Sequence, residues 1–150
     1  MKNLVFAITL LLLSVTVSFA QRNVTPAIDR DPLLEADATH NLDVARQAFG
    51  PARKAYKQVL LRFEETYAAY PDFSKIDEFL YLAGMSSYYL SKNEGRQKVN
   101  LKVEKERERY NPERLREDTV AYLSLMLERN PGTKYRSEAE QIVKELSPPN

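Results

Sequence analysis

A proline-containing turn occurs twice in this chain, sixty residues apart. The first copy is the segment 70–84, YPDFSKIDEFLYLAG, and the second is the segment 130–139, NPGTKYRSEA. Each copy has the pattern of a helix end, a turn with a Ser or Thr cap candidate, and the start of an amphipathic helix. A repeated helix–turn–helix unit is typical of helical arrays, in which each unit buries its apolar face against its neighbours. The sequence therefore predicts an all-α protein that presents surfaces to partners.

Five helices are predicted, which together make about two and a half helix hairpins of an α-solenoid. Asp31-Pro32 and Asn111-Pro112 are strong helix starts, because a capping side chain precedes a proline at the first helical position. Ser74 with Asp77 resembles a capping box for the third helix. That helix is apolar on two sides, so we expect it at the centre of the array. The expected ranges are 32–49, 52–69, 74–91, 112–129 and 135–146.

The first twenty residues have the pattern of a secretory signal peptide. Lys2 precedes an apolar run from Leu4 to Val17, and Ser18-Phe19-Ala20 forms a small-x-small cleavage site before Gln21. An uncleaved anchor is the alternative, but the run is shorter than the ~20 residues that a spanning helix needs. The remaining chain is expected to begin with a flexible leader, residues 21–31, and to end with a frayed tail, residues 148–150. Between them lies one helical repeat domain, residues 32–147, which contains a mobile insertion at residues 92–111.

Composition excludes several classes of function. Without the predicted signal peptide the chain has 21 basic and 21 acidic residues, and this balance gives no argument for binding nucleic acid or an anionic membrane. The chain has no cysteine, so it can form neither a disulfide nor a Cys-based metal site, and it lacks the lipid-bearing Cys of a bacterial lipoprotein. We therefore expect no lipid anchor of its own. No nucleophile or phosphate-loop motif occurs, so we expect no enzymatic activity and no cofactor.

His40 is the only histidine, and Asp37 and Asp43 flank it at helical spacing. A metal site or a proton switch is conceivable there, but a lone histidine on a polar helix face is expected simply to be exposed. The adjacent carboxylates Glu64-Glu65 and Asp77-Glu78 point about 100° apart on a helix, so they cannot flank one substrate atom. No metal site is therefore predicted.

Residues 92–111 interrupt the helical pattern. Three aliphatic residues alternate there with basic and acidic ones, which favours a long, mobile and solvated insertion. Binding of lipid headgroups or peptidoglycan by the charged run 96–116 is the alternative. The surplus of basic residues is small and the two signs are interleaved, so the electrostatic argument for that alternative is weak.

The segment 70–90 resembles the envelope tetratricopeptide-repeat-like (TPR-like) proteins of bacteria, especially the outer-membrane assembly factor BamD family. That family shows a Tyr-Pro turn, then Glu-Ala-x-Tyr-x-x-Gly and a Tyr-Tyr pair. The matching residues are Tyr70, Pro71, Glu78, Tyr81, Gly84, Tyr88 and Tyr89, with Phe79 in place of the alanine; Pro131, Glu138 and Ala139 match in the second copy. Two departures are the missing lipoprotein Cys and room for only two and a half repeats, where the family has about five.

The resemblance implies a non-enzymatic adaptor that is exported to the periplasm, lies at the outer membrane and supports outer-membrane protein assembly. A cell-division or cell-wall coordinator of the YbgF/CpoB type is the alternative, and an exported hydrolase or metal-binding protein comes last. The partner would be a protein or peptide in the concave groove. Candidate groove residues are Tyr81, Met85, Tyr88 and Tyr89, because tyrosine and methionine give large and adaptable contact areas. Packing of these side chains against the first and fifth helices is the competing interpretation.

Two further structural expectations concern close packing and the end of the array. Gly84 lacks a side chain, which would let a paired helix approach closely. The last helix of an array needs a polar outer face, and Arg136, Glu140 and Lys144 are candidates for it. If these residues do not form such a cap, the terminal helix would expose an apolar face, and we would expect a homodimer or a constitutive partner.

Overall fold

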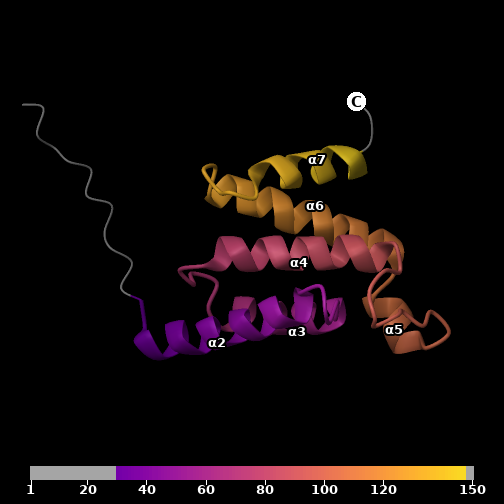
Figure 1. Cartoon of the computed structure of the whole chain (residues 1–150), viewed down its shortest axis with the longest axis horizontal. Helices are drawn as coiled ribbons and strands as arrows, with labels where there is room; N and C mark the ends of the chain where they lie inside the picture. Colours follow the sequence, from indigo (N-terminus) through magenta and orange to yellow (C-terminus); the bar gives the residue numbers. More distant parts are fainter. Residues whose placement is uncertain (1–29, 148–150) are drawn as a thin grey trace, which may run out of the picture.

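The computed structural model describes residues 30–147, and these residues form a stack of packed α-helices without a β-strand (Figure 1). The all-α fold with five packed helices is confirmed. A sixth, short helix lies to one side of the stack. The predicted signal peptide, residues 21–29 of the leader and the tail 148–150 lie outside the described residues. The helices are α2 (Pro32–Phe49), α3 (Tyr56–Ala69), α4 (Ile76–Ser91), the short α5 (Glu104–Arg109), α6 (Pro112–Arg129) and α7 (Arg136–Leu146).

The predicted starts of α2 and α6 are confirmed. The side chain of Asp31 accepts hydrogen bonds from the N–H groups of Leu33, at 2.8 Å, and Leu34, at 3.4 Å. Asn111 Oδ1 accepts one from the N–H of Glu113 at 2.9 Å. Each cap therefore satisfies backbone donors that the first helical turn leaves without a partner.

Helices α3 and α4 begin later than the sequence predicts. Residues 51–53 form a turn and Lys54 has a φ of +44°, so α3 begins at Tyr56 and not at 52. The predicted capping box at Ser74 and Asp77 is wrong. Lys75 is the N-cap residue and no side chain caps α4, because Ser74 belongs to the preceding turn and its N–H donates to Glu35.

The two proline turns have the same backbone hydrogen bonds, displaced by sixty residues. In the first turn, the N–H of Tyr70 donates to the carbonyl of Thr66 at 2.7 Å, and the N–H of Phe73 to that of Tyr70 at 3.3 Å. The N–H of Ile76 donates to the carbonyl of Phe73 at 3.1 Å, and the N–H of Phe79 to that of Lys75 at 3.3 Å. In the second turn, the N–H of Asn130 donates to the carbonyl of Met126 at 2.9 Å, and the N–H of Thr133 to that of Asn130 at 3.0 Å. The N–H of Arg136 donates to the carbonyl of Thr133 at 3.2 Å, and the N–H of Ala139 to that of Tyr135 at 3.0 Å. The repetition in the sequence is therefore a repetition of the backbone.

Helix α4 is the centre of the stack. It packs against α2, α3 and α6, and α6 in turn packs against α7 (Figure 1). The ring of Phe63 on α3 lies 5.6 Å from that of Phe79 and 4.9 Å from that of Tyr122, so aromatic contacts join three helices. A Cβ added to Gly84 would lie 2.7 Å from Cγ and Cδ2 of Leu123 on α6. Glycine at this position therefore permits the close approach of α6 to α4.

The insertion 92–111 contains α5 and several contacts with α3. Lys57 Nζ donates hydrogen bonds to the carbonyl of Lys98 at 2.8 Å and to both carboxylate oxygens of Glu106 at 2.9 Å. Tyr110 is buried, and Lys57 Nζ lies 5.2 Å from its ring centre. The sequence of α5, EKERER, has no apolar residue, so it shows no apolar period that would predict a helix, and the helix buries none of its residues. Among residues 30–147, no helix has both the length and the apolar character needed to cross a membrane.

Candidate partner-binding surface

The four candidate groove residues on α4 do not share one surface. Met85 is 1% exposed and packs in the core, so this residue offers a partner no surface. Tyr81 and Tyr88 are half-buried and contact α7, whereas Tyr89 is half-buried against the end of α2 and the start of α3. The sequence could not separate these positions, because α4 is apolar on more than one side.

Tyr81 joins α4 to the beginning of α7. Its ring stacks on Tyr135 with centroids 3.9 Å apart and planes 10° apart, and its hydroxyl donates to Glu138 Oε2 at 2.6 Å. Burial, followed by the hydrogen bond to Glu138, raises the pKa of Tyr81. The hydroxyl therefore stays protonated and acts as a donor at neutral pH.

Tyr88 makes the corresponding contact two helical turns further along. Its hydroxyl donates to Glu145 Oε1 and Oε2 at 3.0 and 2.9 Å, and Lys92 Nζ lies 3.4 Å from Glu145 Oε1. The hydrogen bond from Tyr88 lowers the pKa of Glu145, and Lys92 acts in the same direction. The two tyrosines are seven residues apart and so are the two glutamates, which fixes how far α7 is displaced along α4.

Tyr89 belongs to a separate aromatic cluster. Its ring stacks on Tyr56, with centroids 5.0 Å apart, and lies 6.2 Å from Phe49. Burial raises the pKa of Tyr89. A shallow hollow of about 270 Å³ beside this cluster is also lined by Lys54 and Glu94. Tyr89 therefore helps to hold the first hairpin and lies apart from Tyr81 and Tyr88.

An ion pair joins α4 to α2. Arg46 donates through Nε to Glu78 Oε1 at 2.7 Å and through Nη2 to Glu78 Oε2 at 2.5 Å, and through Nη1 to Asp43 at 2.6 Å. The hydrogen bond from Arg46 holds the pKa of Glu78 below its ordinary value. Glu78, which the family resemblance marks as a repeat residue, therefore links neighbouring helices in this chain.

Polar contacts consequently run across α2, α4 and α7. Three side-chain pairs make up this surface, which we call the alternate-helix face: Arg46–Glu78, Tyr81–Glu138 and Tyr88–Glu145. Two of its residues were predicted as groove residues. Tyrosine and arginine are enriched among the residues that dominate binding energy at protein interfaces. This surface presents residues of both types, and its polar groups are paired within the chain.

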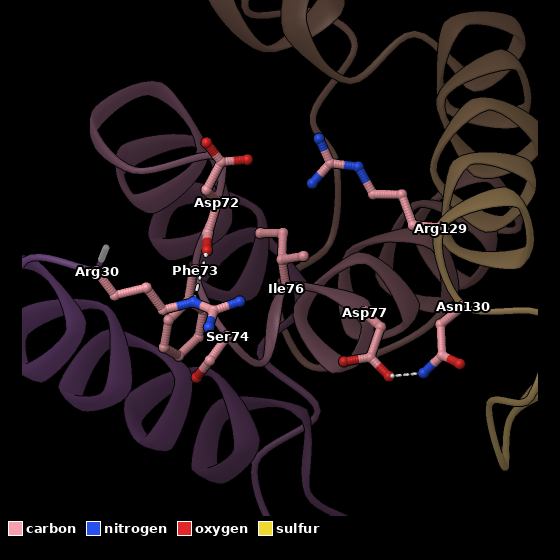
Figure 2. Close-up of a pocket in the computed structure, with 8 residues that line it drawn as sticks. All are labelled: Arg30, Asp72, Phe73, Ser74, Ile76, Asp77, Arg129 and Asn130. Atoms are coloured by element: carbon pink, nitrogen blue, oxygen red, sulfur yellow. Dashed lines mark hydrogen bonds between the residues drawn. The ribbon is translucent and has the colours of Figure 1, made fainter. Parts of the chain in front are cut away.

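A hollow between the two proline turns was not predicted from the sequence. It has a volume of about 390 Å³ and is lined by Arg30, Asp72, Phe73, Ser74, Ile76, Asp77, Arg129 and Asn130 (Figure 2). Asn130 Nδ2 donates to Asp77 Oδ2 at 3.0 Å, and Arg129 Nη1 donates to the carbonyl of Pro71 at 2.9 Å. The residues come from three places in the chain, and no local motif marks them.

His40 is exposed, as are Asp37 and Asp43. Among residues 30–147, no group of three or more His, Asp or Glu side chains lies close enough together to hold a metal ion.

No protein-family model matches this chain, and neither does any curated protein or solved structure. What the fold defines is an all-α stack of helix hairpins with a repeated turn. A relationship to the BamD family remains a prediction from the residues quoted above.

Proposed function

We propose that this chain is a non-enzymatic, TPR-like adaptor of the bacterial envelope, and that it binds a protein or peptide partner in support of outer-membrane protein assembly. The observation that carries the proposal is the pair of proline turns with four equivalent backbone hydrogen bonds each. Stacks of repeated hairpins build extended surfaces of side chains and are used mainly for binding.

The alternate-helix face is the proposed binding surface. In a TPR-like arrangement α2, α4 and α7 would be the first helices of successive hairpins, which line the groove of such arrays. Side-chain bonds between α2 and α4, and between α4 and α7, support this assignment. The hydroxyls and carboxylates on this face are held in fixed positions, so a partner would meet a preorganised surface.

Affinity capture from the native envelope, followed by mass spectrometry, tests the proposal. The tagged mature chain is expected to recover components of barrel assembly, and the double variant Tyr81→Ala/Tyr88→Ala is expected to lose them. Tyr67→Ala is the matched control, because Tyr67 lies on α3 and stacks on Phe63 at 5.3 Å, away from the proposed face. Both variants need a circular dichroism spectrum like that of the native chain.

The same experiment separates the alternatives. Recovery of Tol-type or cell-wall synthesis proteins would move the proposal to a coordinator of the YbgF/CpoB type. Partners that survive the double tyrosine variant but are lost in Tyr67→Ala would place the binding surface elsewhere. Recovery of no specific partner would contradict the adaptor function and return small-molecule binding to consideration.

The outer face of α7 bears on self-association. Arg136 Nε donates to Glu140 Oε1 at 2.8 Å, and these two residues and Lys144 are exposed, as expected of a polar cap. We therefore expect a monomer in multi-angle light scattering. A dimer would instead point to the hollow of about 370 Å³ that Val120, Ala121 and Leu146 line beside the end of α7.

A further inference from the structure

Two arginines from distant parts of the chain face the hollow between the proline turns. Arg30 precedes α2, and Arg129 is the last residue of α6. Figure 2 shows their guanidinium groups on opposite sides of the hollow, with Ile76 between them in this view. We call this hollow, of about 390 Å³, the inter-turn hollow.

Both guanidinium groups are anchored but not neutralised. Arg30 Nε donates to the carbonyl of Asp72 at 3.3 Å, and Arg129 Nη1 donates to the carbonyl of Pro71 at 2.9 Å. A backbone carbonyl fixes a guanidinium without cancelling its charge. Within the described part of the chain neither arginine forms a salt bridge with a carboxylate. Because a guanidinium has five N–H donors, most of them remain for a ligand.

Two carboxylates at the rim limit what the inter-turn hollow can bind. Asp77 already accepts a hydrogen bond from Asn130 at 3.0 Å, and Asp72 is exposed, with its carboxylate extending away from Arg30 in Figure 2. The two acids and the two arginines together have no net charge. A single carboxylate is therefore favoured over a dianion such as phosphate, which the rim acids would repel more strongly.

We propose that the inter-turn hollow binds a carboxylate of a partner peptide, from an acidic side chain or from the C-terminus. This inference rests on the proposed adaptor function, because its ligand is part of a protein. The planar guanidinium matches a carboxylate with two parallel hydrogen bonds. Phe73 and Ile76 form the floor of the hollow but are only 1% and 8% exposed, so the guanidinium groups would make the main contacts with the ligand.

Fluorescence anisotropy with three short labelled peptides tests this site on the mature chain. One peptide has internal glutamates and an amidated C-terminus, one is neutral apart from a free C-terminal carboxylate, and one is neutral and amidated. We expect one of the first two to bind and the third to bind much more weakly. The peptide that binds identifies the source of the carboxylate.

Arginine variants locate the binding. Arg30→Gln and Arg129→Gln are each expected to weaken the affinity about tenfold, since hydrogen bonds to charged groups contribute that much. Arg53→Gln is the matched control, because Arg53 is exposed on the turn after α2 and forms no salt bridge within residues 30–147. All three arginines are exposed, so we expect the variants to keep the native core, and thermal melts verify their folding.

Three results would overturn the site: acidic peptides that bind no better than the neutral one, equal affinity in the Arg30 and Arg129 variants, or an equal loss in Arg53→Gln. The envelope capture experiment separates this site from the proposed function. Partners that are captured equally by the Arg30→Gln/Arg129→Gln chain would refute the site and leave the adaptor function standing. Specific peptide binding without any captured envelope partner would support the site and contradict the envelope function.

Discussion

The two proline turns have the same backbone but lead into helices with different surroundings. Ten of the sixteen residues of α4 are buried, against two of the eleven residues of α7. The side chains at equivalent positions account for the difference: Phe73, Phe79 and Leu80 in the first copy correspond to Thr133, Ala139 and Glu140 in the second. The turn thus sets the path of the chain, and the side chains after it decide whether the helix is central or terminal.

The largest difference in the free energy of unfolding is expected between substitutions at equivalent positions of the two turns. Phe73 is 1% exposed, so Phe73→Ala should lower the free energy of unfolding by about 3–5 kcal/mol. Thr133→Ala removes little apolar volume and a weak 3.5 Å bond to the N–H of Tyr135, so it should cost about 1 kcal/mol or less. Urea unfolding followed by circular dichroism measures both. Thr133 is also buried, at 7% exposed, so the expected contrast comes from the larger apolar volume of Phe73, and equal losses would contradict it.

Glycine substitutions give the next largest contrast. Gly84→Ala should cost about 1–3 kcal/mol, because the new Cβ would lie 2.7 Å from the buried Leu123 and force α6 away from α4. At Gly132 a Cβ would meet only Asn130 Oδ1, at 3.7 Å, so Gly132→Ala should leave the stability unchanged or slightly raised. A well-tolerated Gly84→Ala in thermal melts would mean that α4 and α6 are further apart than described.

Removing the tyrosine contacts with α7 should lower the free energy of unfolding by less, and its effect should be confined to α7. Tyr81→Phe and Tyr88→Phe each remove a hydroxyl that donates to a glutamate, at an expected cost of about 0.5–1.5 kcal/mol. Hydrogen exchange should become faster in α7 while α2 keeps its native rates. In Tyr67→Phe, the matched control, no side-chain bond is lost among the described residues, and α7 should exchange as in the native chain. Faster exchange everywhere would contradict the proposed local role.

The ion pair between α2 and α4 is expected to have the smallest effect on stability, and this effect disappears in acid. Since the folded pKa of Glu78 lies below its unfolded value, its contribution is present above about pH 4.3 and is lost as the pH falls through the folded pKa. Glu78→Gln should therefore flatten the acid side of the curve of stability against pH, by less than about 1 kcal/mol. Glu128→Gln, an exposed control on α6, should leave that curve unchanged.

Features that depend on neighbouring residues could be predicted from the sequence. Asp31 and Asn111 each satisfy backbone donors within three residues, so a local pattern was enough to place the starts of α2 and α6. The start of α4 was misplaced because the turn before it uses backbone bonds, which a Ser-x-x-Asp pattern does not indicate. The late start of α3 depends on the positive φ of Lys54, which is not a glycine.

The candidate site was harder to predict because its contacts join distant residues. Tyr81 and Glu138 are 57 residues apart, and Arg30 and Arg129 are 99 apart. Periodicity identified the apolar stripes of α4, but it could not show that Met85 is buried in the core while Tyr81 contacts α7. The neighbouring helices determine which side of α4 stays accessible, so the sequence of α4 alone could not indicate it.

Amide hydrogen exchange measured by NMR tests the repeated turn most directly. The N–H groups of Tyr70, Phe73, Ile76 and Phe79 and their equivalents sixty residues on donate to backbone carbonyls, so both sets should be protected. The second set should exchange faster, because the half-covered α7 opens before the central α4. Unprotected amides at Asn130, Thr133, Arg136 and Ala139 would contradict the repeated turn. Equal protection of both sets would contradict the difference between a central and a terminal helix.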